Sequence, residues 1–376
     1  MLLLSRLDHG GMERVQLNIA KSLHARGFDI VIAAGKINAD PNGELPPDIR
    51  IVEIAPSGPA SFPTGVVRVL RRERPDVVFT TANDVACLVL AMRAITFSDI
   101  RVIVTQHLSL SGPRLAARGL RRIKLELVRA LMWLLVRRAD KIVAVSDGVA
   151  RDLQSDIGVD GSRIVTIHNP VIGSDFEERS CANVPWPWGD LAAPTFAFVG
   201  RLSKEKRLDL LISSFRRLLE TRPARLIIVG TGPLHDQLSQ EISTAGLDAH
   251  CRLTGYTENP LPYIRASCAL VLCSDYEGFG NVLVEAMACG TQVIATDCPS
   301  GPAEILQGGK YGQLIPRGDG DALVGAMRRV LDERRIPAEK LIERAKDFSI
   351  ERAIDAYHKL IQEIMQTNRA SDRSGG

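Results

Sequence analysis

The sequence predicts an α/β protein built from two doubly wound domains, each a parallel sheet with helices on both faces. Short runs rich in β-branched residues alternate with longer amphipathic patterns along the whole chain. The runs are almost continuously apolar, which is typical of parallel strands buried on both faces. Because 376 residues exceed the size of a typical domain, two sheets are favoured over one large sheet.

The apolar runs define the strands in chain order. In the first half they predict strands at residues 29–35, 50–55, 76–82, 101–107, 141–146 and 164–169. In the second half they predict strands at 195–200, 225–230, 251–256, 269–274 and 292–297. Leu2 to Ser5 is a minimal further strand, which leaves open whether residues precede Met1. Ligands of such sheets bind beyond the carboxyl ends of the strands, so residues that follow strands are the functional candidates.

Composition places the domain boundaries. Residues 1–180 are predicted to form the first domain and residues 195–348 the second. The segment "CANVPWPWGDLAAP" at 181–194 is rich in proline and small residues, so it is predicted to be a linker. A last helix is expected over 349–366 with Ser349 as its N-cap, and the polar tail 367–376 is expected to be disordered.

Overall composition argues against several classes of protein. The net charge is only +3, which gives no indication of nucleic-acid binding. The seven cysteines include no Cys-x-x-Cys pair, which predicts reduced residues in a cytoplasmic protein. The first apolar run is too short for a signal peptide, and no stretch approaches the ~20 apolar residues of a membrane-spanning helix.

The stretch "EGFGNVLVEAMACG" places two glutamates, Glu277 and Glu285, around a glycine turn and a helical pattern. Gly278 and Gly280 permit unusual backbone dihedrals, and Asn281 then opens the predicted helix. The N–H groups at such a helix start suit an anion such as a phosphate. The alternative is an ordinary helix start with a solvated glutamate, and the spacing alone leaves both open.

A second polar cluster follows the strand predicted at 195–200. Gly200 ends this strand, and Arg201 and Lys206 precede a helix that starts near Leu208. Two cations at the carboxyl end of a strand can neutralise a diphosphate, although a solvated loop is the commoner outcome of this pattern taken alone.

Together these motifs resemble the retaining glycosyltransferases of the fourth sequence family, which have the two-Rossmann GT-B architecture. The matching segments occur in order as "GGMERVQLNIAKSLHARGFDI", "GRLSKEKRLDLLI", "IIVGTGP", "LTGY" and "SDYEGFGNVLVEAMACGTQVIATD", and the resemblance covers essentially the whole chain. It implies two Rossmann-like domains that face a cleft, and a C-terminal helix that crosses back to the first domain.

The resemblance also implies roles for individual residues. Arg201 and Lys206 match the pair that binds the donor diphosphate, and Glu285 matches the acid that bonds the ribose. Glu277 matches the acid that contacts the transferred sugar, and His107 matches the histidine near the anomeric centre. The backbone that holds sugar and phosphate oxygens is matched by Gly278, Phe279, Gly280, Asn281 and Val282. The nucleobase segment is matched by Gly255 and Tyr256, and the loop facing diphosphate and acceptor by Gly10 and Gly11.

The implied activity is transfer of a sugar from a nucleotide-sugar donor to a carbohydrate or polyprenyl-linked acceptor in polysaccharide or glycolipid assembly. A UDP-sugar is the first choice of donor and a GDP-sugar the second. The alternatives are a nucleotide-sugar epimerase or hydrolase of the same architecture and an inactive binding subunit. Same-face displacement competes with Glu277 as a covalent nucleophile. Met12 and Asn281 depart from the residues common in the family, which leaves the sugar open.

No metal or other cofactor is expected. The triplet "DGD" at Asp319–Asp321 looks like the metal-binding DxD motif of other glycosyltransferases, but it precedes a helical pattern, so helix capping is favoured. The histidines are dispersed without metal-ligand spacing. The charge of the leaving diphosphate is instead assigned to Arg201, Lys206 and a helix dipole.

The segment "GPRLAARGLRRIKLELVRALMWLLVRR" is the most basic part of the chain, with eight basic residues and one acid between Arg114 and Arg138. Five apolar residues share one helical face, and three arginines lie opposite: Leu120, Ile123, Leu127, Leu131 and Leu134, with Arg118, Arg122 and Arg129. This pattern suits an anionic membrane surface, which predicts a cytoplasmic enzyme bound peripherally to the inner face of the plasma membrane. The equally weighted alternative is that the apolar face packs on its own domain.

Overall fold

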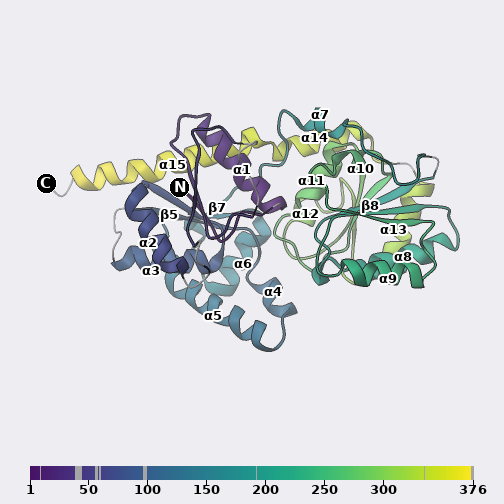
Figure 1. The fold of residues 1–376 in the computed structure, drawn as a ribbon, viewed down its shortest axis with the longest axis horizontal. Coiled ribbons are helices and arrows are strands. Elements are labelled where there is room, and N and C mark those ends of the chain that lie inside the picture. Colours follow the sequence, from purple (N-terminus) through teal and green to yellow (C-terminus); the bar gives the residue numbers. More distant parts are fainter. Residues whose placement is uncertain are drawn as a thin grey trace. The chain divides into compact units, whose positions relative to one another are not determined.

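The computed structural model describes residues 1–8, 10–38, 45–55, 58, 61–95, 100–191, 193–333 and 335–373, with side chains for all but 94–95 and 367–373. The chain forms two compact units, shown in Figure 1. Unit 1 combines Met1–Pro170 with the segment that begins at Ile350, and unit 2 is Val171–Ser349. Each unit contains one parallel sheet, as the sequence predicts.

The sheet of unit 1 has seven strands in the order β3-β2-β1-β4-β5-β6-β7, and all neighbouring strands are parallel. The strands are β1 (Leu2–Leu4), β2 (Val31–Ala34), β3 (Arg50–Glu53), β4 (Val77–Thr80), β5 (Arg101–Gln106), β6 (Lys141–Ala144) and β7 (Ile164–Thr166). The strand order reverses between β1 and β4, which is the switch point where doubly wound sheets bind ligands.

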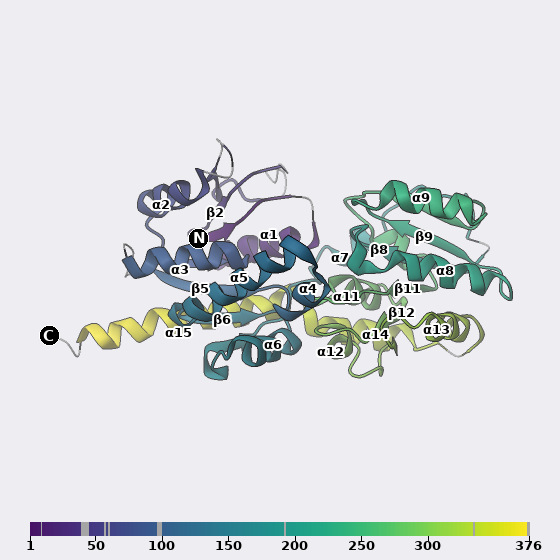
Figure 2. The same cartoon turned by 90° about the horizontal axis from the view of Figure 1, so that it is seen from below.

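Helices cover both faces of this sheet. They are α1 (Gly11–His24), α2 (Phe62–Glu73), α3 (Asn83–Ile95), α4 (Ser111–Ala116), α5 (Gly119–Leu135), α6 (Asp147–Ile157) and α15 (Ile350–Arg373). Helices α1 and α15 pack side by side over a core that includes Leu2, Ile32 and Tyr357. Helix α3 contacts β4 and β5, and α5 lies alongside α3 (Figure 2).

The last helix, α15, returns to unit 1, which confirms the crossing-back helix implied by the resemblance. Tyr357 is buried there and meets Phe79 edge-on, with ring centroids 5.9 Å apart. The helix begins at Ile350, directly after the expected N-cap Ser349, and continues to Arg373. It therefore extends through residues 367–373, most of the segment expected to be disordered, as a continuation of the helix whose earlier turns pack in the core of unit 1. Residues 374–376 lie outside the described residues.

The division between the units lies at Pro170–Val171, ahead of the segment predicted to be a linker. That segment belongs to unit 2 because its tryptophans pack there. Trp186 stacks on Tyr263 with ring centroids 6.1 Å apart, and the indole N–H of Trp188 donates to the carbonyl of Ala249 at 2.9 Å. Burial of large aromatic side chains outweighs the loop-like composition of residues 181–194.

The sheet of unit 2 has six parallel strands in the order β10-β9-β8-β11-β12-β13, so its strand order reverses between β8 and β11. The strands are β8 (Thr195–Val199), β9 (Arg225–Val229), β10 (Cys251–Gly255), β11 (Ala269–Leu272), β12 (Gln292–Thr296) and β13 (Gln313–Ile315). Strand β13 was not predicted, because its three residues lie between Gly312 and Pro316, which are typical of a loop.

The helices of unit 2 are α7 (Phe176–Ser180), α8 (Leu208–Leu219), α9 (His235–Thr244), α10 (Leu261–Arg265), α11 (Asn281–Ala288), α12 (Pro302–Ile305), α13 (Gly320–Asp332) and α14 (Ala338–Ala345). Helix α8 packs against α13, and α11 packs against α14. Among the helices that the structure describes, none combines the length and the apolar content needed to cross a bilayer.

Candidate active site

The carboxyl edge of the unit 2 sheet is held together by backbone contacts between glycines. Gly200, after β8, donates to the carbonyl of Val229, and Gly230, after β9, donates to the carbonyl of Gly255 at the end of β10. Gly230 has φ +135°, and a Cβ atom there would lie 2.0 Å from the carbonyl oxygen of Gly200. Only glycine allows the strand ends to approach this closely.

The loop after β8 carries the two predicted cations. The side chain of Arg201 is exposed and makes no hydrogen bond or ion pair within the described part of the chain. Lys206 lies one short turn further on, with its side chain mostly buried. The carbonyl of Glu205 accepts a hydrogen bond of 2.8 Å from the amide of Asp275. This bond joins the cationic loop to the loop after β11.

Glu277 lies in the second of these loops and is only 9% exposed. Its Oε1 atom accepts hydrogen bonds from Nζ of Lys206 at 2.5 Å and from Oγ of Ser274 at 2.6 Å. Ser274 is fully buried, and its carbonyl accepts a 2.6 Å bond from the hydroxyl of Thr296. The ammonium compensates the charge of the carboxylate, and the hydroxyl fixes its orientation.

The glycine turn leads directly into α11, whose N-cap is Gly280. Gly280 has φ +100° and no side chain with which to cap the helix, so the first turn presents backbone N–H groups without a side-chain acceptor at the cap position. The ring of Phe279 is buried edge-on against Phe348, which leaves only its backbone to face a ligand. Asn281 is half-buried at the start of the helix.

The position of this turn depends on Gly301, which has φ +90°. A Cβ atom at Gly301 would lie 1.8 Å from the carbonyl oxygen of Phe279, so the two backbones are in direct contact. Two further predicted donor-binding residues, Val282 and Glu285, lie in the first and second turns of α11, both half-buried.

The predicted nucleobase segment ends β10. Gly255 has φ +76°, and the pairing of β10 with β9 shifts register between Leu253 and Gly255. Tyr256 follows with 49% of its surface exposed. An exposed aromatic ring after an edge strand is suited to stacking on a planar base.

The predicted acceptor-side residues lie in unit 1. Gly10 is the extended N-cap of α1, Gly11 is the first residue of the helix, and the carboxylate of Glu13 lies beside Gly10. His107 follows β5, and its Nε2 atom lies 3.0 Å from the amide nitrogen of Gln16 on α1. The amide therefore donates to an unprotonated Nε2, and the ring proton is on Nδ1. Desolvation lowers the pKa of His107 to about 4, so the ring is neutral near pH 7.

The structure thus gathers the predicted donor-binding residues on one sheet edge of unit 2, where Lys206 and Glu277 are in contact. His107, Gly10 and Gly11 lie at the corresponding edge of unit 1. Three supporting residues had no predicted role: Ser274, Gly301 and Gln16. Ser274 ends a predicted strand, which is a detectable signal, whereas the contacts of Gly301 and Gln16 join segments distant in sequence.

The alternative metal motif is a helix cap. Asp319 is the N-cap of α13, and its Oδ1 atom accepts a 2.8 Å hydrogen bond from the amide of Ala322. Within the described ranges, no group of three or more His, Cys, Asp or Glu side chains could hold a metal ion. All seven cysteines are free thiols.

Comparison with known proteins assigns the chain to a family. A model described as Glycosyltransferase Family 4 matches residues 9–172, and one described as Glycosyl transferases group 1 matches residues 190–348. One relative is the N-acetylgalactosamine-N,N'-diacetylbacillosaminyl-diphospho-undecaprenol 4-alpha-N-acetylgalactosaminyltransferase of Campylobacter jejuni, 28% identical over 58% of this chain and 59% of the relative. The chain spans about half the length of the curated relatives it matches.

Solved structures show the same fold over the whole chain. Sucrose-phosphate synthase from Thermosynechococcus elongatus superposes with a TM-score of 0.81 at 19% identity, and the match covers 98% of this chain and 100% of the synthase chain. HepE of Anabaena in complex with UDP-glucose superposes with a TM-score of 0.75 at 19% identity, covering 97% of this chain and 99% of the other. With two parallel doubly wound sheets of the GT-B type, and with both halves matched, the chain belongs to glycosyltransferase family 4.

Proposed function

We propose that this protein transfers a sugar, with retention of anomeric configuration, from a nucleotide-sugar to a carbohydrate or polyprenyl-linked acceptor in polysaccharide or glycolipid assembly. The observation that carries the proposal is the contact between Lys206 and Glu277 beside the start of α11, where the N-cap Gly280 has no side chain. Arg201, which has no ion-pair partner among the described residues, lies on the same sheet edge. These groups offer two positive charges and backbone N–H donors for a diphosphate, and a carboxylate for sugar hydroxyls.

Each group has one task in this scheme. Arg201, Lys206 and the N–H groups of Asn281 and Val282 bind the diphosphate, whose negative charge grows as it leaves. Glu277 binds a hydroxyl of the transferred sugar. Glu285 binds the ribose, and Gly255 and Tyr256 bind the base. The backbone of Gly278 and Gly280 also binds the sugar and phosphate oxygens. In unit 1, neutral His107 and the Gly10–Gly11 loop serve the anomeric centre and the acceptor.

The chemistry breaks the bond between the anomeric carbon and a phosphate oxygen and forms a bond from that carbon to the acceptor oxygen. In same-face displacement the proton of the acceptor hydroxyl passes to the leaving phosphate oxygen. The buried Oε1 atom of Glu277 already accepts two hydrogen bonds, which favours its use as a binding group over nucleophilic attack. Mass spectrometric trapping of a glycosyl–Glu277 adduct would establish the covalent route instead.

Similar proteins support a UDP-sugar and a lipid-linked acceptor. HepE was solved with UDP-glucose, and the C. jejuni relative is named for a diphospho-undecaprenol acceptor. We accordingly place the enzyme in the cytoplasm, peripherally bound at the inner face of the plasma membrane where such acceptors lie. The segment 114–138 is the surface proposed to contact that membrane. No metal is required in this scheme, since Arg201, Lys206 and the helix dipole supply the positive charge.

Thermal-shift titration with UDP-, GDP- and ADP-sugars tests the donor assignment directly. We expect a UDP-sugar to raise the melting temperature, and Glu285→Ala and Arg201→Ala to weaken that binding by roughly tenfold or more. Arg222→Ala, which removes another exposed arginine of unit 2, is the matched control and should bind normally. Equal donor affinity in Glu285→Ala and wild type would contradict the ribose role.

Product analysis tests the activity itself. We expect a transferred glycoside with a soluble or polyprenyl-linked acceptor, and turnover that persists in EDTA. Glu277→Ala should reduce kcat by about 10²-fold or more with a smaller effect on donor affinity. An epimer or free sugar as the sole product would replace the transferase with one of the alternative activities, and loss of turnover in EDTA that Mg²⁺ or Mn²⁺ restores would refute metal independence.

A further inference from the structure

Helix α5 presents an apolar face to solvent. Leu120, Ile123 and Leu127 are 85%, 66% and 61% exposed, and Leu131 and Leu134 on the same face are also exposed. These are the residues that the sequence groups on one helical face. The alternative that this face packs on its own domain is therefore wrong.

A different side of α5, away from the exposed apolar face, packs on unit 1. Met132 is fully buried, Val136 just beyond the helix is buried, and Leu125 and Val128 are half-buried. Helices α3 and α6 of unit 1 both contact α5. Helix α5 is thus apolar on two sides, and the buried side alone satisfies the packing needs of the domain.

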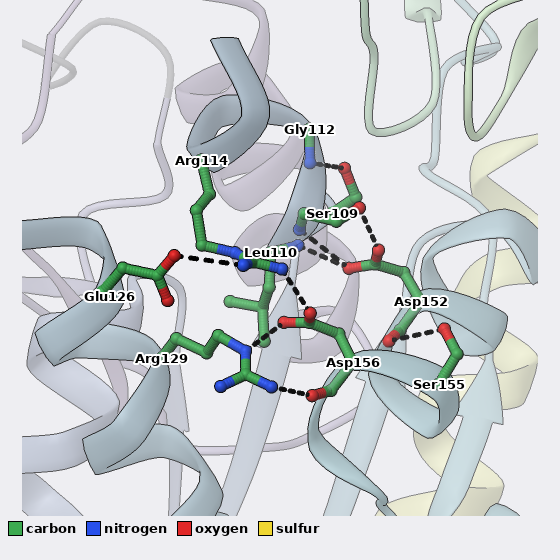
Figure 3. Close-up of polar contacts among 10 residues, drawn as sticks. Ser109, Leu110, Gly112, Arg114, Glu126, Arg129, Asp152, Ser155 and Asp156 are labelled. Carbon is green, nitrogen blue, oxygen red and sulfur yellow. Dashed lines mark hydrogen bonds and ion pairs between the residues drawn. The ribbon is translucent and has the colours of Figure 1, made fainter. Parts of the chain in front are cut away.

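A polar cluster under α5 holds it in this orientation, as Figure 3 shows. Asp156 of α6, whose side chain is only 10% exposed, receives Nε of Arg129 from α5 at 2.9 Å and a terminal nitrogen of Arg114 from α4 at 2.5 Å. Arg129 also donates to the backbone carbonyl of Asp156, and Arg114 also pairs with Glu126 of α5 at 3.1 Å. One carboxylate therefore ties two helices to a third.

A second carboxylate of α6 holds the start of α4. Asp152 accepts a hydrogen bond from the backbone amide of Leu110 at 2.6 Å (Figure 3). It also accepts from the backbone amide of Ser111 at 3.3 Å and from the hydroxyl of Ser111. We refer to Arg114, Arg129, Asp152 and Asp156 as the polar clamp. Since breaking a mostly buried ion pair is costly, the clamp resists any rotation of α5 that would hide its outer face.

The charges around the outer face select the class of partner. Six basic side chains of this segment are exposed: Arg118, Arg121, Arg122, Lys124, Arg137 and Arg138. The single acid, Glu126, is paired with Arg114. Exposed leucine and isoleucine on a segment rich in exposed cations complement an anionic bilayer, where the apolar side chains enter the interface and the cations attract the segment to phosphate headgroups. A second copy of this chain would bring the same cations face to face across a two-fold axis.

We infer that α4 and α5 form a preformed docking surface for an anionic lipid bilayer, and that the polar clamp holds its apolar face outward before the membrane is met. This inference deepens the proposed function and rests on it, because a polyprenyl-linked acceptor would lie in that bilayer. The clamp residues do not touch lipid themselves; Asp152 and Asp156 are positioning residues.

Sedimentation of the full chain with vesicles tests the surface. We expect binding to vesicles of phosphatidylglycerol and phosphatidylcholine, and little binding to phosphatidylcholine alone. The triple variant Leu120→Ser, Ile123→Ser, Leu127→Ser and the double variant Arg118→Glu, Arg122→Glu should each lower binding by roughly tenfold or more. The matched controls, Leu191→Ser and the double variant Arg68→Glu, Arg71→Glu on α2, alter exposed residues elsewhere and should retain most of the binding.

Asp156→Asn tests the polar clamp, because charge attraction and loss of the clamp predict opposite changes in vesicle binding. This change makes the protein more positive, so simple electrostatic attraction predicts tighter binding to anionic vesicles. Loss of the clamp predicts weaker binding, by roughly threefold or more, since α5 is no longer held apolar side out. Asp156→Glu, which keeps the carboxylate, should retain part of the vesicle binding that Asp156→Asn loses. Circular dichroism must show that Asp156→Asn remains folded, and Asp152→Ala provides a second variant if it does not.

The outcomes separate this inference from the proposed function. Absence of wild-type binding, or equal binding to neutral and anionic vesicles, overturns the docking surface, while transfer to a soluble acceptor would still support the glycosyltransferase. Unchanged or tighter binding of both Asp156→Asn and Asp152→Ala overturns the clamp. A wild-type dimer in size-exclusion chromatography that the triple leucine variant abolishes would assign the face to a second copy instead.

Discussion

The ammonium of Lys206 lies 2.5 Å from the carboxylate of Glu277, although 71 residues separate them in the chain. The two side chains are 20% and 11% exposed, so both charges are largely removed from water. In the proposed reaction both would contact the donor, Lys206 its diphosphate and Glu277 its sugar. Their mutual contact keeps each charge compensated while no donor is bound.

This pair should show strong energetic coupling. Lys206→Met leaves the carboxylate of Glu277 without its cation and should lower the free energy of unfolding by about 2–4 kcal/mol. The double variant with Glu277→Gln should recover at least about 1 kcal/mol of that loss, as measured by urea unfolding.

The pair Arg217–Asp321 is the natural control, because its atoms are also 2.5 Å apart while its side chains are 47% and 85% exposed. Its coupling should stay within about 0.5 kcal/mol. Additive effects of Lys206→Met and Glu277→Gln would contradict the coupling.

Gly301 should be intolerant of any side chain. Gly301→Ala forces a Cβ atom against the carbonyl of Phe279 and strains a φ of +90°, so we expect a loss of about 3 kcal/mol in stability and weaker donor binding. Thermal unfolding with and without a UDP-sugar measures both effects.

Gly308→Ala separates backbone strain from the close contact. Gly308 has φ +65°, but a Cβ atom added there would meet no other atom within 4 Å, so this variant should lose only about 1 kcal/mol and bind donor normally. Equal effects of the two substitutions would show that the contact with Phe279 is unimportant.

Substitution of the two aspartates of the "DGD" triplet should affect stability unequally, because only Asp319 caps a helix. Asp319→Ala removes the N-cap of α13 and should cost about 1 kcal/mol of stability. Asp321→Ala alters an exposed side chain and should cost no more than about 0.5 kcal/mol. Neither should change the rate of transfer. If both variants lost activity while remaining folded, the metal-binding interpretation would regain support.

His107 should make stability depend on pH. Its pKa is about 4 in the folded protein, against an ordinary 6.5, because burial disfavours the charged ring. The unfolded chain therefore takes up a proton first as the pH falls, so this contribution is complete above pH 6.5 and is lost progressively toward pH 4.

The size of the effect follows from the linkage. Between pH 7.5 and pH 5 the wild type should lose up to about 2 kcal/mol more stability than His107→Gln, as measured by urea unfolding at the two values. Identical pH dependence in wild type and variant would show that the folded protein does not hold the ring neutral.

Much of the fold could be predicted because the governing signals are local. An apolar run such as 269–274 requires burial on both faces wherever it lies, and a glycine turn before a helical pattern exposes N–H groups in any context. The candidate residues Glu277, Lys206 and Arg201 were found in this way, since each lies in a loop that follows a strand. The boundary at Pro170 could not be predicted, because the tryptophans of residues 181–194 join unit 2 through tertiary contacts with Tyr263 and Ala249.

The sequence alone determined the two-sheet α/β class, the strand ends that carry polar residues, and which residues of α5 share a face. Tertiary structure decided the contact between Lys206 and Glu277, the buried Ser274 that orients the carboxylate, and the outward direction of Leu120, Ile123 and Leu127. The physical reason is that periodicity depends on neighbours along one helix or strand. Which of two apolar faces meets the core depends on side chains such as Asp156, contributed by a segment folded from elsewhere in the chain.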